Sequence, residues 1–364
     1  HKEDYVADGT PIVTVEHLGN KMFSEQNLPR VSNTDKNRLK KYVLKQGDIV
    51  FSRVGSVDRC SYVDQKHDGW MFSGRCLRVR PTSEIDSEYL YYYFCLEETK
   101  QFVRNIAVGA TMPSINTKLL GEVVVTFPEL EQQKRISGIL SAIDSKIEVN
   151  QKINDNLSDL LQTIYQGQFG KVGLANNCGI LADICSYSKD KIEISKLSLD
   201  TYYSTENMLP EKSGAVKATS LPTTSQTTAC HKGDTLISNI RPYFKKIVYC
   251  EDDCGCSTDV LCFKPVHPRY TAYLFSTLYA DSFFNFMVAG AKGTKMPRGD
   301  KQQIMTYPVV LPSEKDLSEF NSVATPILTQ IYSNRTESER LSAIRDTLLP
   351  KLILGEIDVS SIQL

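Results

Sequence analysis

Hydrophobic and polar positions alternate along this chain in two patterns that predict a mixed α+β fold. Short apolar runs bounded by Gly, Pro, Asn and Asp are typical of strands. Four of these runs predict strands over 42–44, 48–52, 76–80 and 122–127. Aromatic and leucine residues at helical spacing predict helices over 88–104 and 270–288.

A second kind of pattern follows Pro128, where acidic residues indicate a helix start. Apolar and Asn residues then recur in steps of four and three, which is the spacing of a coiled-coil seam. This seam comprises Ile136, Leu140, Ile143, Ile147, Asn150, Asn154, Leu157, Leu161 and Ile164. A less strict seam comprises Phe320, Ala324, Ile327, Ile331, Asn334, Ser338 and Leu341. Pro326 interrupts it and is predicted to kink the helix or start a new one.

The two patterns occur twice, at an offset of 184 residues from about residue 73 onward and of 186 residues upstream, where 47–52 matches 233–238. Gly-Ala-Thr-Met-Pro at 109–113 aligns with Gly-Thr-Lys-Met-Pro at 293–297, and Asn150 aligns with Asn334. Each copy is long enough to form its own core, which favours tandem domains over a solenoid. We therefore predict globular domains over 1–127 and 171–312, each followed by a long helix, over 128–170 and 313–364.

Asn150 and Asn334 occupy equivalent seam positions. A buried Asn in a coiled coil costs stability and fixes the register. If the two helices pair with each other antiparallel, the two Asn side chains can meet near the middle. The alternative is that both face solvent at a break in the seam.

Charge is distributed unevenly although the net charge is only −1. The net charge is +1 over 1–127 and +3 over 171–312, whereas the two helical segments carry −2 and −3. Cations cluster within 30–45, 241–246 and 292–301. Such clusters suit phosphate binding, but ordinary solvated loops have the same composition.

The composition of 41% hydrophobic and 23% charged residues is that of a soluble globular protein, and no apolar run is long enough to cross a bilayer. No signal peptide is visible in the sequence, so we expect the ten cysteines to be reduced thiols and the protein to be cytoplasmic. Cys250, Cys254 and Cys256 have the spacing C-x3-C-x-C, which does not match the usual C-x2-C of zinc sites. We expect no metal site.

Catalytic motifs are missing from the sequence. It contains no Gly-rich nucleotide loop, no H-E-x-x-H and no G-x-S-x-G, and its five His residues are scattered. An Asn/Asp-Pro-Pro-Tyr/Phe stretch, with which amino-methyltransferases hold a target base, is also missing. The sequence therefore favours a binding protein over an enzyme.

Several segments together resemble the specificity (S) subunit of type I restriction–modification systems. They are Phe-Pro-Glu-Leu-Glu-Gln-Gln-Lys-Arg-Ile at 127–136, Arg-Asp-Thr-Leu-Leu-Pro-Lys-Leu-Ile-Leu-Gly-Glu-Ile at 345–357, Gly-Asp-Ile-Val-Phe-Ser-Arg-Val-Gly at 47–55 and Gly-Ala-Thr-Met-Pro-Ser-Ile-Asn at 109–116. The helix segments are the more specific ones. The tandem layout, which covers nearly the whole chain, is also a property of this family.

The resemblance implies a non-catalytic DNA-recognition protein. Each globular domain would be a target-recognition domain that reads one half of a split sequence in double-stranded DNA. The two helices would pair as an antiparallel coiled coil and separate the half-sites. They would also dock two methyltransferase (M) subunits, which carry S-adenosylmethionine, and motor-nuclease (R) subunits would join the complex.

Arg and Asn on loops are the residues best suited to read guanine and adenine. For base readout we predict Arg53, Arg59, Arg75, Asn116, Asn239, Arg241 and Arg298. For phosphate contacts we predict Lys36, Arg38, Lys40, Lys41, Lys245, Lys246, Lys292 and Lys295. For helix pairing and M-subunit docking we predict Ile136, Leu140, Ile143, Ile147, Asn150, Leu157, Leu161, Ile327, Ile331, Asn334 and Leu341.

The two copies also differ. The second domain opens with Ile-Leu-Ala-Asp-Ile-Cys at 180–185, and the offset places its counterpart at or before residue 1. We therefore expect the first domain to lack this opening strand. One alternative function is a stand-alone DNA-binding or antirestriction protein with the same architecture, and another is an enzyme with unrecognised chemistry.

Overall fold

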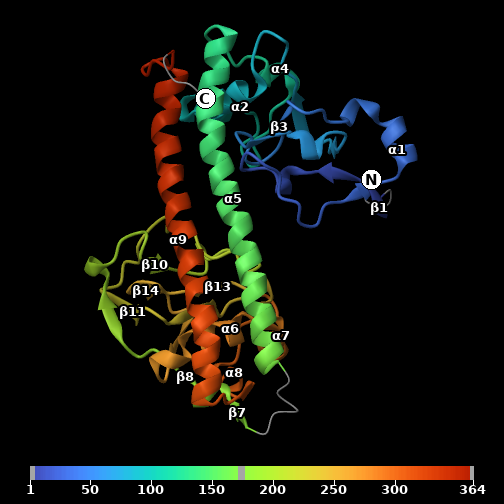
Figure 1. Cartoon of the computed structure of the whole chain (residues 1–364). Helices are drawn as coiled ribbons and strands as arrows, with labels where there is room; N and C mark the ends of the chain where they lie inside the picture. The colour runs from blue at the N-terminus through green and yellow to red at the C-terminus, as the bar shows by residue number, and fades with distance from the viewer. Residues whose placement is uncertain (1–4, 171–176, 361–364) are drawn as a thin grey trace. The chain divides into compact units, whose positions relative to one another are not determined.

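The computed structural model describes residues 5–170 and 177–360. These residues form two compact units, unit 1 within 1–149 and 337–364 and unit 2 within 150–336. Two long helices, α5 (Leu130–Phe169) and α9 (Glu314–Ile353), are drawn in Figure 1. One part of each helix belongs to unit 1 and the other part belongs to unit 2. The predicted α+β architecture, with a long helix after each globular part, is confirmed. No helix among the described residues is both long and apolar enough to cross a membrane.

Unit 1 (1–149 and 337–364) contains two three-stranded sheets, with the orders β4-β3-β6 and β2-β1-β5. Its strands are β1 (Tyr5–Val13), β2 (Arg30–Val31), β3 (Ile49–Ser52), β4 (Cys60–Tyr62), β5 (Met71–Phe72) and β6 (Cys76–Val79). Its short helices are α1 (Asn33–Arg38), α2 (Ser87–Cys95), α3 (Glu97–Ile106) and α4 (Thr117–Leu120). Strand β3 is central and fully buried, because α2 packs on its sheet through Phe94 against Phe51.

Unit 2 (150–336) contains sheets with the orders β13-β12-β15-β8, β10-β14-β11-β9 and β16-β7. Its strands are β7 (Cys178–Ile180), β8 (Cys185–Tyr187), β9 (Lys191–Glu193), β10 (Tyr202–Tyr203), β11 (Gln226–Cys230), β12 (Thr235–Ser238), β13 (Ile247–Tyr249), β14 (Cys254–Cys256), β15 (Val260–Pro265) and β16 (Pro308–Val310). Its short helices are α6 (Thr271–Tyr279), α7 (Asp281–Ala289) and α8 (Lys301–Ile304).

The repeat in the sequence is a repeat in the fold. The three strands β4-β3-β6 correspond to β13-β12-β15, and helices α2, α3 and α4 correspond to α6, α7 and α8. The predicted strands at 48–52 and 76–80 are confirmed as β3 and β6. The strand predicted at 42–44 is wrong: Lys40–Tyr42 is a 3₁₀ turn, and only Val43 makes a β-bridge, with Met71.

Each helix predicted over 88–104 and 270–288 is in fact two helices. Leu96 and Ala280 have extended backbones, with ψ of 136° and 142°, and they end one helix and precede the next. Acidic residues follow directly at Glu97 and Asp281, where they face the positive end of the second helix dipole. Helical spacing continues across the break, and for this reason the apolar pattern did not reveal it.

The segment 122–127 is not a strand, although its alternation predicted one. Its counterpart β16 pairs antiparallel with β7 in unit 2, whereas the described residues of unit 1 provide 122–127 with no strand partner. Val124 is consequently 80% exposed. A pattern of alternation describes one strand, but a strand also needs a neighbour that the pattern does not specify.

The predicted seams pack as helix pairs in each unit. In unit 1, Ile136 and Leu140 of α5 are buried in one core with Leu352 of α9. In unit 2, Leu161 of α5 shares a core with Phe320 of α9. Other seam residues of α9 in this core are Ala324, Ile327 and Ile331.

Pro326 neither ends α9 nor starts a new helix, so that part of the prediction is wrong. Helix α9 is continuous from Glu314 to Ile353. Pro326 is exposed, so its ring lies on the solvent side of the helix, where water can bond the carbonyl group that the proline cannot.

Three buried asparagines join the helices within unit 2. The Nδ2 atom of Asn334 donates to Oδ1 of Asn154 at 2.8 Å. Asn150 donates to the backbone oxygen of Asn334 at 3.4 Å, and Asn154 donates to that of Ile331 at 3.2 Å. The predicted meeting of Asn150 and Asn334 is therefore confirmed, and the solvent-facing alternative is wrong. These bonds fix the register because an offset of one residue would bury the amides without partners.

We expect Asn334→Ala to destabilise unit 2 by about 1–3 kcal/mol, because the amide of Asn154 loses its buried partner. The measurement is the free energy of unfolding in urea. Ser333→Ala, at the exposed neighbouring position, is the control and should stay within about 0.5 kcal/mol. An Asn334→Ala protein as stable as the control would show that the asparagines do not hold the helices.

Candidate nucleic-acid interface

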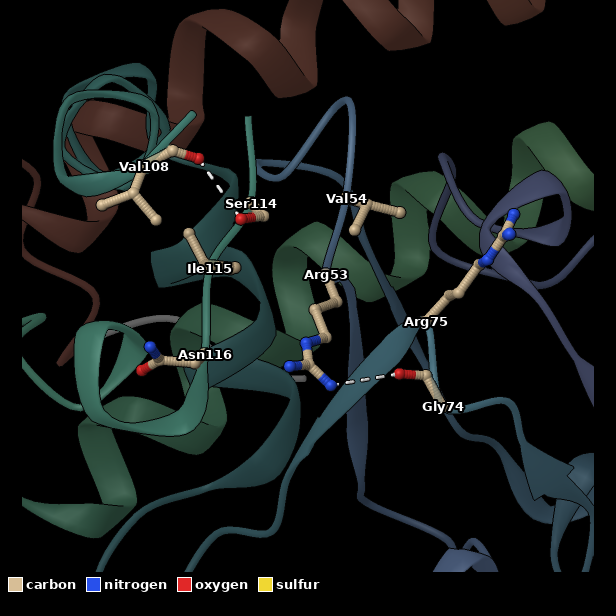
Figure 2. A pocket seen from close by; sticks show the side chains of 8 residues that line it. All are labelled: Arg53, Val54, Gly74, Arg75, Val108, Ser114, Ile115 and Asn116. Atoms are coloured by element: carbon tan, nitrogen blue, oxygen red, sulfur yellow. Dashed lines mark hydrogen bonds between the residues drawn. The ribbon is translucent and has the colours of Figure 1, made fainter. Parts of the chain in front are cut away.

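Three loops of unit 1 meet at one end of the β4-β3-β6 sheet and surround an open pocket of about 330 Å³ (Figure 2). They are the loop after β3, the turn before β6 and the loop between α3 and α4. The pocket is lined by Arg53, Val54, Gly74, Arg75, Val108, Ser114, Ile115 and Asn116. Three of the four residues predicted for base readout in the first domain thus line one site, which we call tip 1.

Backbone hydrogen bonds hold the three loops of tip 1 together. The amide of Arg53 donates to the carbonyl of Arg75 at 2.9 Å, and the amide of Ile115 donates to the carbonyl of Arg53 at 3.0 Å. Ser114 forms β-bridges with both Val54 and Val108. A fixed backbone of this kind leaves the side chains free to contact a ligand at little entropic cost.

The side chains of tip 1 carry positive charge toward solvent. Arg53 and Arg75 are exposed, and neither forms an ion pair among the described residues. Arg53 Nη1 lies 3.4 Å from the carbonyl oxygen of Gly74, and Figure 2 shows Arg75 pointing away from Arg53. Asn116 has a structural task as well, since its Oδ1 caps α4 by accepting from the amide of Leu119 at 3.0 Å. Its amide NH₂ is the part left for a ligand.

Unit 2 repeats this arrangement at a second tip, which we call tip 2 and which comprises 239–241, 257–259 and 291–300. The amide of Asn239 donates to the carbonyl of Asp259 at 2.8 Å, as Arg53 does to Arg75. Arg298 forms β-bridges with both Ile240 and Lys292, as Ser114 does in tip 1. The two tips therefore have the same backbone arrangement.

The side chains of the two tips differ. Asp259 stands where tip 1 has Arg75, and Arg298 stands where tip 1 has Ser114. Arg298 is exposed and its Nη2 and Nε atoms lie 3.1 and 3.3 Å from Oδ1 of Asp259. This carboxylate orients the guanidinium, which keeps further donors for a base edge.

Two residues predicted for base readout in domain two have other surroundings than expected. Asn239 is only 6% exposed, and a Cβ on Gly299 would lie 2.9 Å from its Oδ1 atom. The structure therefore argues against base readout by Asn239. Arg241 is half-buried, and its amide donates to the carbonyl of Pro297 at 2.8 Å, so it borders tip 2. Arg59 is exposed on the loop between β3 and β4, outside the lining of the tip 1 pocket.

The residues predicted for phosphate contacts do not line the tip 1 pocket. Lys36 and Arg38 lie on α1, and Lys40 and Lys41 lie on the following 3₁₀ turn. Arg38 pairs with Asp35 at 2.8 Å, and this contact together with Ser32 lowers the pKa of the Asp35 carboxyl.

In unit 2, the predicted phosphate contacts lie at or beside tip 2. Lys292 pairs with Asp300 at 2.5 Å, and Lys295 is exposed on the same loop. Lys245 pairs with Asp281 at 3.0 Å. Lys246 donates to the carbonyl of Thr205 at 2.6 Å, and burial lowers its pKa.

Five cysteines form part of a small core in unit 2, beside Leu236 and Val248. They are Cys230, Cys250, Cys254, Cys256 and Cys262. The Sγ atoms of Cys250 and Cys254 are 3.6 Å apart. Across 5–170 and 177–360, no group of three or more His, Cys, Asp or Glu residues has an arrangement that could hold a metal ion. All five cysteines are buried, and their side chains contribute to this core.

Sequence reasoning missed two features of tip 2. One is Asp259, which carries no signal in the sequence until it is aligned with Arg75. The other lies beside tip 2 and is the exposed aromatic pair Tyr243 and Phe244, which Pro242 separates from Arg241. The basic loop 241–246 was noted for its charge, and two adjacent aromatic residues after a proline were the additional signal.

Comparison with known proteins identifies the kind of molecule. Residues 1–159 match the family model described as "Type I restriction modification DNA specificity domain". The MjaIX specificity subunit of Methanocaldococcus jannaschii is 22% identical, over 78% of this chain and 72% of that protein. The HindI specificity subunit of Haemophilus influenzae is 28% identical, over 35% of this chain and 29% of that protein.

A solved structure has the same fold. The S subunit of a type I restriction–modification system from M. genitalium superposes with a TM-score of 0.53 at 18% identity, covering 97% of this chain and 91% of that one. Residues 1–159 thus match the specificity-domain family, and the chain is similar in sequence and in fold to specificity subunits of type I restriction–modification systems.

Proposed function

We propose that this specificity subunit reads a two-part DNA target, with tip 1 contacting one half-site and tip 2 the other. The observation that supports this most strongly is the shared backbone of the tips. The β-bridges of Ser114 in tip 1 and of Arg298 in tip 2 occupy equivalent places, while the side chains around them differ. Two loops with the same backbone arrangement but different hydrogen-bond donors are suited to recognise two different DNA sequences.

We further propose that α5 and α9 dock two methyltransferase subunits, which bring S-adenosylmethionine, and that a motor-nuclease subunit can join them. The seam residues predicted for pairing and docking are mostly buried between the helices: Ile136, Leu140, Asn150, Leu161, Ile327, Ile331 and Asn334. Ile143, Ile147, Leu157 and Leu341 are half-buried. We therefore propose that the methyltransferase subunits contact other apolar residues that are exposed on the helices: Val149, Ile153, Leu160, Val323 and Ile344.

The test of this function is methylation sequencing of a host that carries the chain with its methyltransferase subunit. The expected result is modification at a motif made of two short sequences separated by a fixed gap. A continuous motif would contradict two-part reading. Failure of the chain to co-purify with a methyltransferase subunit would favour the stand-alone DNA-binding or antirestriction protein instead.

Arg53→Ala and Arg298→Ala should each impair recognition of a different half-site. An Arg that bonds guanine is worth about 1–3 kcal/mol, so the affinity for the correct target should fall by about 5- to 150-fold. The measurement is competition binding with duplexes mutated in one half-site at a time. Each variant should become indifferent to mutations in only one half.

Lys66→Ala and Lys232→Ala are the matched controls, since both remove an exposed, ion-paired cation outside the tips. They should leave half-site preference unchanged. Equal loss of affinity for every sequence would make Arg53 or Arg298 a phosphate contact and not a reader of bases.

A further inference from the structure

Tyr243 and Phe244 form an exposed aromatic pair beside tip 2. They lie in the 3₁₀ turn Pro242–Phe244, between β12 and β13. Their side chains are 47% and 37% exposed, and their ring centroids are 4.8 Å apart. Aromatic side chains gain much of their free energy from burial, so two adjacent rings in solvent indicate a binding surface.

The backbone that presents these rings is strained. Arg241 and Lys245, on either side of the turn, both have left-handed conformations, with φ of 49° and 51°. This conformation costs a non-glycine residue on the order of 1–3 kcal/mol. In tip 1 the residue equivalent to Arg241 is Gly55, which has φ of 75° at no such cost. Both residues donate their amides to a proline carbonyl at 2.8 Å, which confirms their equivalence.

A second loop holds the strained turn in place. The amide of Glu211 donates to the carbonyl of Phe244 at 2.8 Å, and the amide of Lys212 donates to that of Lys245 at 3.0 Å. The ammonium groups of Lys212 and Lys245 both contact Oδ1 of Asp281, at 2.8 and 3.0 Å. The rings are thus exposed but preorganised, which lowers the entropic cost of binding a ligand.

The surroundings of the rings favour DNA over protein. Arg241, Lys245 and Lys246 all lie in the same loop, and the Nζ atom of Lys246 is 5.9 Å from the ring centroid of Phe244. Lysine is depleted at the centre of protein–protein interfaces, whereas cations beside aromatic rings suit a polyanion with stacked bases. Only Arg241 separates the turn from Ile240, which bridges to Arg298 in tip 2.

We propose that Tyr243 and Phe244 form an aromatic wedge that stacks against an opened base step of duplex DNA in the half-site contacted by tip 2. This inference rests on the proposed function. The equivalent turn of tip 1 has Ser56, Val57 and Asp58, and none of them offers an aromatic ring. The two tips therefore differ in how they deform DNA as well as in which bases they contact.

The test uses the full chain assembled with its methyltransferase subunit and duplexes that carry 2-aminopurine at successive positions of each half-site. The fluorescence of 2-aminopurine rises when the base loses its stacking neighbour. Because methyltransferases flip their target base, the methylated position of each half-site is left as adenine. At the other positions we expect a several-fold rise at one step of the tip 2 half-site and none in the tip 1 half-site. The double variant Tyr243→Ala, Phe244→Ala should abolish the rise and weaken binding about tenfold or more.

Two variants serve as controls. Tyr243→Phe retains the ring and should retain the fluorescence rise. Ser56→Ala changes the equivalent turn of tip 1 and should alter nothing. Thermal unfolding of the double alanine variant should match that of the unsubstituted chain, because both rings are exposed.

Three results would overturn the wedge. One is a double alanine variant that binds and fluoresces as the unsubstituted chain does. Another is weakened assembly with the methyltransferase subunit and unchanged fluorescence, which would make the rings a protein contact. A third is a two-part methylation motif without any fluorescence rise, which would leave the proposed function intact. Absence of a two-part motif would remove both proposals together.

Discussion

Phe320→Ala is expected to destabilise unit 2 by about 3–5 kcal/mol, because truncation of a fully buried aromatic ring leaves a cavity. Phe320 on α9 is 0% exposed. Its ring lies 5.5 Å from that of Phe169 on α5 and 6.5 Å from that of Tyr273 on α6, measured between centroids. One side chain thus joins both long helices to the globular part of the unit.

The measurement is the urea dependence of unfolding, followed by circular dichroism. Val323→Ala is the matched control, because Val323 lies on the same helix one turn away and is 44% exposed. It should change the free energy of unfolding by less than about 0.5 kcal/mol. Equal effects of the two substitutions would show that the aromatic cluster contributes little to the attachment of the helices.

Periodicity predicted the parts of the fold that depend on neighbours along the chain. The seam from Ile136 to Leu161 and the buried strand β3 follow from local spacing alone. The break at Leu96 and the unpaired segment 122–127 do not, because they depend on a change of backbone direction and on a partner strand. The internal repeat predicted what periodicity could not, because the offsets of 184 and 186 residues indicate which elements of the two copies are equivalent.

The candidate site was predicted in part, for a related reason. Arg53, Arg75 and Asn116 were selected as loop residues with suitable donors, and the fold brings them to one pocket. Asn239 was selected by the same rule, but it is buried, because donor chemistry in a sequence carries no information about exposure. Asp259 was missed because its role depends on Arg298, which lies 39 residues away along the chain.

An ionic network in unit 1 joins the globular part to both long helices. Asp144 on α5 accepts from Nη1 of Arg345 on α9 at 2.8 Å and from the hydroxyl of Tyr92 on α2 at 2.6 Å. Asp144 and Arg345 are 12% and 30% exposed at their side chains. The pKa of Arg345 is raised despite burial, because the carboxylates of Asp144 and Asp346 stabilise its charge. The carboxylate of Asp144 therefore connects α5 with both α9 and α2.

Asp144→Ala should destabilise unit 1 by about 3 kcal/mol, because it leaves the charge of Arg345 and the hydroxyl of Tyr92 without their acceptor. This value is at the lower end for broken buried pairs, since Arg345 retains some contact with water. Asp346→Ala removes the other, 64%-exposed partner of the same arginine and should cost less than about 1 kcal/mol. The free energy of unfolding in urea, measured for both variants, tests this difference.

If the geometry of unit 1 sets the position of tip 1 on DNA, Asp144→Ala should also lower the preference for the tip 1 half-site at temperatures where the chain remains folded. Recognition of the tip 2 half-site should be unchanged. Equal stabilities of the two variants would assign the attachment of the helices to apolar packing alone.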